Sequence, residues 1–110
     1  MNSKSTRDDF RDYYEVCFKE FADRVKYWMT LNVPTSYSVS GYVFGSSPPG
    51  RCLDRQNLNC IDGDSGTEPY LVILHQLLAH AAAVKLYKHK FQGRQKITIG
   101  ISLETGWVVP

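Results

Sequence analysis

Two short strand-like segments, each preceded by a helical pattern, constrain the fold of this chain more than any other feature. The first segment runs from Tyr27 to Asn32 and is followed by Pro34, and the second runs from Ile97 to Leu103. The second helical pattern lies between them, so it supplies the crossover that two parallel strands require. A parallel pair needs cover on both faces, which two strands cannot provide for each other. The order helix, strand, long loop, helix, strand therefore predicts part of a larger α/β array.

The first helix is predicted from apolar residues that recur at spacings of three and four. It spans about Asp8 to about Lys26, and Thr6 with Asp9 resembles a capping box at its start. Its apolar face consists of Phe10, Tyr14, Cys17, Phe21 and Val25. A free cysteine on such a face usually acts as a small hydrophobic side chain, so we expect Cys17 to be buried and inert.

The second helix is predicted from Tyr70 to Phe91 and is apolar on nearly all sides. Such a composition indicates a helix that other elements cover on most of its surface. Ser65 with Glu68 resembles a capping box, and Pro69 suits a first helical turn. The histidines of this segment lack the spacing and the acidic partner of a helical metal site. We expect them to be packed or hydrogen-bonded: His75, His80 and His89.

The segment from Val33 to Gly66 shows little periodicity and is rich in proline, glycine and serine, so it is predicted to be a long loop. Pro34 is expected to end the first strand and to hold Val33 in an extended conformation. The aromatic residues of the loop either pack it onto the body or line a cleft, and packing is favoured: Tyr37, Tyr42 and Phe44. Asp62 and Asp64 are followed by none of the later ligands of a calcium loop, which favours a solvated turn.

The chain contains three cysteines, of which Cys52 and Cys60 lie close together in the long loop. In the cytosol these two thiols are expected to stay reduced, whereas a chain that matures in the secretory pathway is free to bridge them. A zinc site is not predicted, because no histidine lies nearby at a suitable spacing.

The composition indicates a single globular domain of 110 residues with 43% hydrophobic residues. The net charge of +2 comes from 13 basic and 11 acidic residues spread along the chain, so no nucleic-acid partner is predicted. No stretch reaches the roughly 18 uninterrupted apolar residues of a membrane helix, and the first residues form no apolar signal region. These features predict neither a membrane association nor a cofactor or metal, and they leave the localisation open.

Several longer stretches resemble glycoside hydrolase family 1, in particular the plant β-glucosidases, including the cyanogenic ones. The stretches are Tyr13–Phe21, Asp23–Trp28, Thr30–Asn32, Pro49–Cys52, Gly63–Val72, His75–Val84, Ile99–Ile101 and Trp107–Pro110. The resemblance covers about the whole chain beyond its first few residues. It implies an α/β fold, a partial (β/α)₈ TIM barrel, in which residues 1–110 form a single partial domain from about helix 3 to strand 5.

The resemblance also assigns roles to individual residues. Family 1 enzymes hydrolyse β-glucosides with retention, using an acid/base glutamate on the fourth strand and a nucleophilic glutamate on the seventh. The acid/base belongs to a Thr-Leu-Asn-Glu-Pro motif, which here reads Thr30-Leu31-Asn32-Val33-Pro34. Asn32 thus matches the asparagine that binds the sugar 2-hydroxyl, and Val33 occupies the acid/base position. The nucleophile segment is expected beyond Pro110, and Cys52 and Cys60 match a family disulfide.

These observations predict a β-glucosidase-like polypeptide that does not turn over substrate by itself and whose ligand, where a site remains, is a β-glucoside or related sugar. A non-catalytic remnant that binds sugar or a partner is the alternative, and a partial gene product without a stable fold is a third reading. No specific protein partner is predicted. The family resemblance admits a secreted, vacuolar or plastidic location.

Overall fold

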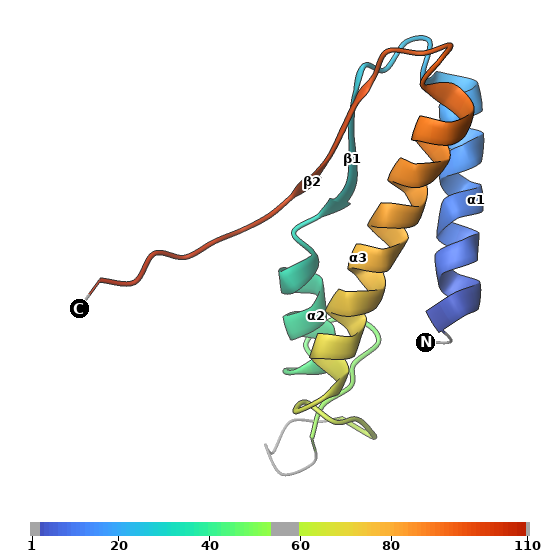
Figure 1. Cartoon of the computed structure of the whole chain (residues 1–110). Helices are drawn as coiled ribbons and strands as arrows, with labels where there is room; N and C mark the ends of the chain where they lie inside the picture. The colour runs from blue at the N-terminus through green and yellow to red at the C-terminus, as the bar shows by residue number, and fades with distance from the viewer. Residues whose placement is uncertain (1–2, 54–59, 110) are drawn as a thin grey trace. The chain divides into compact units, whose positions relative to one another are not determined.

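The computed structural model describes residues 3–53 and 60–109 of the chain. Its elements are α1 (Ser3–Phe21), β1 (Tyr27–Asn32), α2 (Pro34–Tyr42), α3 (Glu68–Leu86), the π-helix η2 (Tyr87–Phe91) and β2 (Thr98–Ser102), as Figure 1 shows. The chain divides into two compact units. The first comprises Met1–Asn32 with His75–Ile101, and the second comprises Val33–Leu74 with Ser102–Pro110.

The two strands are neighbours in one sheet and run in the same direction (Figure 1). At the start of the pair the Thr98 amide donates to the carbonyl of Lys26 over 2.8 Å. At its end the Val33 amide donates to the carbonyl of Ser102 over 2.9 Å, so both strands advance together. This arrangement confirms the predicted parallel pair, and α3 with η2 is the crossover between the strands.

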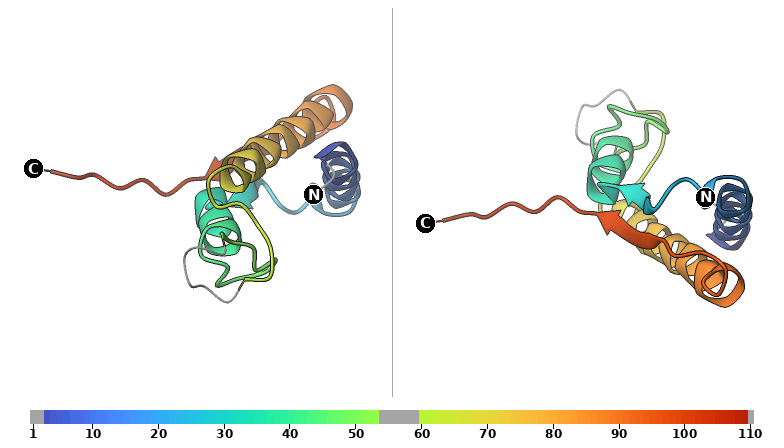
Figure 2. Two further views of the ribbon diagram at one scale, coloured as in Figure 1. Left: turned by 90° about the horizontal axis from the view of Figure 1, so that it is seen from below. Right: turned by 90° about the horizontal axis from the view of Figure 1, so that it is seen from above.

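The core of the first unit is a cluster of aromatic rings between α1, the end of α3 and η2. Its buried members are Tyr14, Phe18, Ala83, Tyr87 and Phe91, with Phe10, Trp28, Leu86, Ile97 and Ile99 packed against them. The ring of Phe18, which is fully buried, lies 5.3 Å from Trp28 and 5.5 Å from Tyr87 between ring centroids. Edge-to-face and tilted contacts at this distance add to the burial of large apolar area. Figure 2 shows α1 beside the crossover helix.

The boundaries of α1 differ from the prediction at both ends. The helix begins at Ser3, so Thr6 lies inside its first turns and the predicted capping box is wrong. It ends at Phe21, whose carbonyl accepts hydrogen bonds from the amides of Arg24 and Val25 and thereby closes a turn before β1. Phe21 and Val25 are therefore exposed rather than part of the core face. Cys17 is a free thiol and is half-buried rather than buried.

The predicted long loop begins with a helix, α2, which sequence periodicity did not indicate. Pro34 occupies the first turn of α2, where its missing amide hydrogen costs nothing and its fixed φ suits the helix. The Ser38 hydroxyl donates to the carbonyl of Pro34 over 2.9 Å inside the buried face. Val33 is not extended as predicted, because φ 47° and ψ 63° place it in the left-handed helical region.

The crossover helix runs from Glu68 to Phe91 as α3 and η2, close to the predicted segment. The predicted capping box of Ser65 and Glu68 is wrong, because the Ser65 hydroxyl bonds to Val43 and Leu53. The Glu68 amide donates to the backbone carbonyl of Asp64, and the Asp64 carboxylate accepts from the Thr67 hydroxyl. The expectation that this helix is mostly covered is wrong for the described residues: exposed side chains include Tyr70, Leu71, Leu74, Leu77 and Leu78. By length and composition alone, this helix also meets the criterion for a membrane span, a criterion that core helices meet as well.

Candidate active site at the end of the first strand

The residues that the sequence singled out for chemistry lie where β1 ends and α2 begins. Asn32 is the last residue of β1, and its exposed side chain forms no hydrogen bond with the described residues. Its amide offers one acceptor oxygen and two donor hydrogens, the groups that suit a sugar hydroxyl. Ligand sites of parallel α/β folds lie at this end of the strands. Asn32 is thus free to contact a polar ligand.

Val33 follows in a backbone conformation that a β-branched side chain rarely adopts. Its φ of 47° places Cβ close to the following carbonyl, a clash that costs roughly 1–2 kcal/mol for a residue other than glycine. Two backbone hydrogen bonds hold it: its amide donates to Ser102 and its carbonyl accepts from the amide of Ser36 over 3.1 Å. The surroundings therefore impose the conformation, and the isopropyl group there can neither donate nor accept a proton.

A hydrogen-bonded chain of three residues fixes the strand two positions before Asn32. The buried hydroxyl of Thr30 lies 2.6 Å from Nδ1 of His80 on α3 and donates to the carbonyl of Gly100 on β2 over 3.3 Å. The prediction that His80 is hydrogen-bonded is confirmed. Thr30 thereby joins β1 to both the crossover helix and β2.

Glu104 is the carboxylate that the structure links to the start of α2. The Ser36 hydroxyl donates to Oε2 of Glu104 over 3.2 Å, and Ser36 also bonds to the carbonyl of Val33 through its amide. Glu104 is exposed, two residues beyond the end of β2. Ser36 thus bonds to both Glu104 and Val33 and links this carboxylate to the position of Val33.

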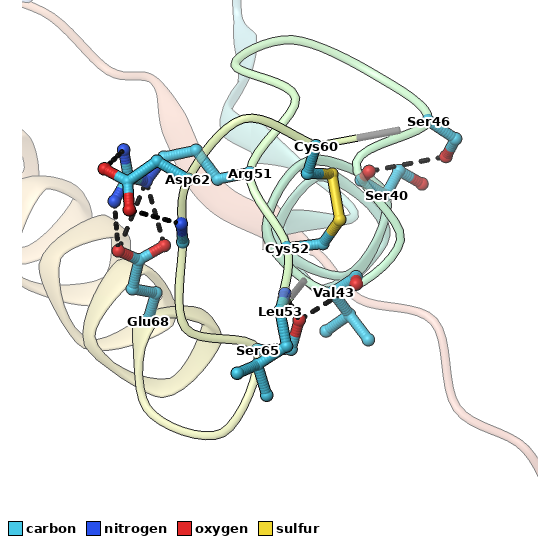
Figure 3. The surroundings of a disulfide bond; sticks show 11 residues. Ser40, Val43, Ser46, Arg51, Cys52, Leu53, Cys60, Asp62, Ser65 and Glu68 are labelled. Atoms are coloured by element: carbon cyan, nitrogen blue, oxygen red, sulfur yellow. Dashed lines mark hydrogen bonds and ion pairs between the residues drawn. A yellow bond between two sulfur atoms is a disulfide. The ribbon is translucent and has the colours of Figure 1, made fainter. Parts of the chain in front are cut away.

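An arginine clamp holds the segment that leads from α2 to α3, as Figure 3 shows. Nε and Nη2 of Arg51 donate to the carboxylate of Glu68 at distances down to 2.6 Å, and Nη1 donates to Asp62 over 3.3 Å. A bidentate guanidinium–carboxylate pair of this kind is geometrically specific. The Arg51 hydrogen bonds hold the pKa of the Glu68 carboxyl below its ordinary value and raise the pKa of Arg51.

Next to the clamp, Cys52 and Cys60 form a disulfide with a Cα–Cα distance of 5.6 Å, and Cys52 is buried (Figure 3). Gly45 approaches the bridge so closely that a Cβ there would lie 2.2 Å from the Cys60 sulfur, and its φ of 63° also favours glycine. The Ser65 hydroxyl joins two further parts of this unit, because it donates to the carbonyl of Val43 and accepts from the amide of Leu53.

The remaining residues that the sequence highlighted have structural partners. Asp62 binds Arg51, the Asp64 carboxylate accepts from the Gly66 amide and the Thr67 hydroxyl, and the described residues hold no cluster of three or more metal-ligating side chains. Of the loop aromatics, Tyr42 is buried with its ring 6.2 Å from that of Tyr37, while Tyr37 and Phe44 are about half exposed. The predicted packing therefore holds for Tyr42, against which the half-exposed Tyr37 lies. The family resemblance makes Asn57 and Asn59 ordinary polar residues of this loop, and both lie outside the described residues.

Comparison with known proteins decides the family. The model of glycosyl hydrolase family 1 matches residues 1–110. The chain belongs to glycosyl hydrolase family 1. A cyanogenic β-glucosidase of Trifolium repens is 58% identical over 103 residues, which cover 94% of this chain and 24% of that protein. β-Glucosidase 24 of Oryza sativa subsp. japonica is 53% identical over 103 residues, covering 94% of this chain and 20% of the relative.

Solved structures of family 1 members confirm the partial-barrel fold. A crystal structure of a rice β-glucosidase superimposes with a TM-score of 0.87 at 48% identity, covering 91% of this chain and 21% of that one. A β-glucosidase of the fungus Humicola insolens, solved in complex with glucose, gives a TM-score of 0.85 at 37% identity over 93% of this chain and 21% of its own. The segment is thus a partial TIM barrel of this family, and it spans about a quarter or less of the curated relatives.

Two features of this family 1 segment escaped sequence reasoning. The clamp between Arg51 and Glu68 joins residues 17 positions apart across a stretch without periodicity, so no spacing indicated it. The chain from His80 through Thr30 to Gly100 joins residues up to 70 positions apart. A buried threonine between apolar neighbours was the available signal, because a buried hydroxyl needs a partner.

Proposed function

We propose that this chain is a β-glucosidase-like polypeptide, equivalent to about helix 3 to strand 5 of the family 1 barrel, that does not hydrolyse β-glucosides by itself. Residues 1–110 form a single partial domain in this proposal. The observation that carries it is Val33, which stands at the acid/base position of the Thr-Leu-Asn-Glu-Pro motif at the end of β1.

The chemistry explains why Val33 decides the outcome. Retaining hydrolysis uses two carboxyl groups about 5–5.5 Å apart, one to protonate the leaving group and one to attack the anomeric carbon. A valine carries no proton to transfer, and loss of general acid–base catalysis costs on the order of 10²–10⁴ in rate. The nucleophile of the family belongs to the seventh strand, and we assign no counterpart of it within these 110 residues. Both catalytic carboxylates are then absent from the segment.

Asn32 is the residue we propose for sugar binding. It matches the family asparagine that contacts the sugar 2-hydroxyl, and its side chain is exposed and without a hydrogen-bond partner among the described residues. The ligand class is a β-glucoside or its glucose product, in line with relatives that are named β-glucosidases. The Thr30–His80 bond supports the strand that presents Asn32.

Release of nitrophenol from an aryl β-glucoside by the purified chain tests the proposal. We expect no turnover above buffer from the wild type, and none from Val33→Glu, because one restored carboxylate lacks the second. Turnover by the wild type would overturn the proposal outright. Turnover by Val33→Glu alone would mean that a second catalytic carboxylate exists here, and the double variant with Glu104→Gln would show whether Glu104 supplies it.

A further inference from the structure

Basic residues gather at the end of the first unit where its two helix-to-strand turns lie. Residues 85–96 hold five of the 13 basic residues of the chain and none of its 11 acidic ones, so this segment carries +5 and the rest of the chain −3. The turn at residues 22–26 adds two basic residues and one acidic residue. The net charge of +2 averages over this separation and therefore conceals a strongly basic surface.

Hydrogen bonds and a ring contact hold the two turns side by side. The Thr98 amide donates to the carbonyl of Lys26 over 2.8 Å, and Nε2 of Gln95 donates to the carbonyl of Phe18 over 3.2 Å. The ring of Phe91, at the end of η2, lies 5.6 Å from that of Phe18 between centroids. Figure 1 shows both turns at the same end of this unit, each between a helix and a strand. Their proximity therefore follows from contacts inside the unit and not from an uncovered strand edge or helix flank.

Six exposed cations form this surface, which we name the basic end: Arg24, Lys26, Lys88, Lys90, Arg94 and Lys96. Two of them have acidic partners, because Arg24 pairs with Asp23 and Lys90 with Glu15. The other four form no ion pair with a described residue. The helix dipole accounts for the two lysines in the last turn of the helix, but not for the four cations that lie in the turns. Helix stability alone therefore does not explain the basic end.

Apolar side chains lie among these cations. Phe21, at the end of α1, is 46% exposed and Val25, in the turn after it, is 40% exposed. The guanidinium of Arg24 lies 5.9 Å from the centroid of the Phe21 ring. The headgroup region of a membrane suits such a mixture, because cations meet the lipid phosphates while apolar groups reach the acyl boundary. Four of the six cations are lysines, which are flexible point charges that attract an anionic surface without requiring a fixed geometry.

We propose that the basic end docks the chain on an anionic phospholipid surface. A nucleic acid needs a basic groove that follows its backbone, whereas these cations lie in two short turns and the last helical turn at one end of the unit. Lys26 precedes β1 and Asn32 ends it, so the docking surface and the proposed sugar contact lie at opposite ends of this strand. Membrane docking therefore leaves Asn32 accessible, and the proposal does not depend on sugar binding.

Co-sedimentation of the full chain with vesicles tests the proposal. One set contains phosphatidylcholine and phosphatidylserine at about three to one, and a second set of pure phosphatidylcholine measures partitioning that needs no charge. Each Lys or Arg near an anionic surface strengthens binding about fivefold, which corresponds to about 1 kcal/mol. We expect the double variant Arg94→Gln/Lys96→Gln to bind the anionic vesicles roughly 25-fold more weakly than the wild type. Raising the ionic strength from about 0.1 M to about 1 M shortens the Debye length from about 10 Å to about 3 Å and should abolish the binding.

The double variant Lys4→Gln/Arg7→Gln is the matched control, since it removes the same charge near the start of α1, at the other end of that helix from the basic end. It should bind the anionic vesicles as the wild type does, and circular dichroism checks that every variant folds. No binding, equal binding to both sets of vesicles, or equal losses in the two double variants would overturn the proposal. Tighter binding to a duplex oligonucleotide than to the anionic vesicles, at the same ionic strength, would overturn it too and assign the basic end to a nucleic acid.

Discussion

Replacement of Thr30 by valine tests whether the hydrogen-bonded chain behind Asn32 stabilises the first unit. Valine has nearly the same shape as threonine, so the substitution removes the hydroxyl and leaves the packing in place. It deletes the contacts to His80 at 2.6 Å and to the Gly100 carbonyl at 3.3 Å. A net hydrogen bond contributes about 1 kcal/mol, and a buried group left without a partner costs about 1–3 kcal/mol.

His80 is only half-buried and regains water as a partner, so the lower part of that range applies. We expect Thr30→Val to lower the free energy of unfolding by about 2 kcal/mol. With a urea m-value of about 1–3 kcal/mol/M, the midpoint falls by roughly 1 M. Trp28 fluorescence reports on this unit, because the indole packs against Phe18 in the core, whereas Trp107 is 91% exposed.

Two further variants make the result interpretable. Thr98→Val changes an exposed threonine at the start of β2 and should alter stability by less than about 0.5 kcal/mol. A cycle with His80→Leu should show a coupling of about 1 kcal/mol between Thr30 and His80. A Thr30→Val chain as stable as the wild type, or additive single effects in the cycle, would refute the role assigned to this bond.

Three other outcomes follow from the second unit and the cysteines. Arg51 lowers the pKa of Glu68 in the folded chain from its ordinary value of 4.5. The ion pair therefore stabilises the folded state above pH 4.5, and its contribution to the free energy of unfolding is lost as the pH falls through the lower pKa of the folded state. The stability gap between wild type and Glu68→Gln, measured by urea unfolding, should therefore shrink between about pH 5 and pH 3, and a gap that does not change with pH would contradict this. Thiol titration of the oxidised, denatured wild type should find one free cysteine, Cys17, and a count of three would exclude the bridge. Gly45→Ala should raise that count to three, because its Cβ would occupy the space of the Cys60 sulfur; a count of one would show that the loop adjusts.

Sequence reasoning predicted best the helices and strands whose buried side can be read from the spacing of nearby apolar residues. Phe10 and Tyr14 of the predicted α1 face belong to the observed core, whereas the fully buried Phe18 was not predicted, and the alternation in Tyr27–Asn32 coincides with β1. The predicted capping box of Ser65 and Glu68 at the start of α3 is wrong. The side chain of Ser65 is used instead by Val43 and Leu53. Caps depend on which neighbour competes for the side chain, and that information is not local.

The junction at Val33 and Pro34 shows why the rest was out of reach. Proline is compatible with the end of a strand and with the first turn of a helix, so the residue alone does not distinguish them. A β-branched residue disfavours positive φ, so the sequence argued for an extended Val33. The bond from the Val33 amide to the Ser102 carbonyl, 69 residues later by the numbering, reverses that preference, and it exists only because β2 pairs with β1. The conformation of Val33 therefore depends on the pairing of β1 with β2, which the local sequence around Val33 and Pro34 does not specify.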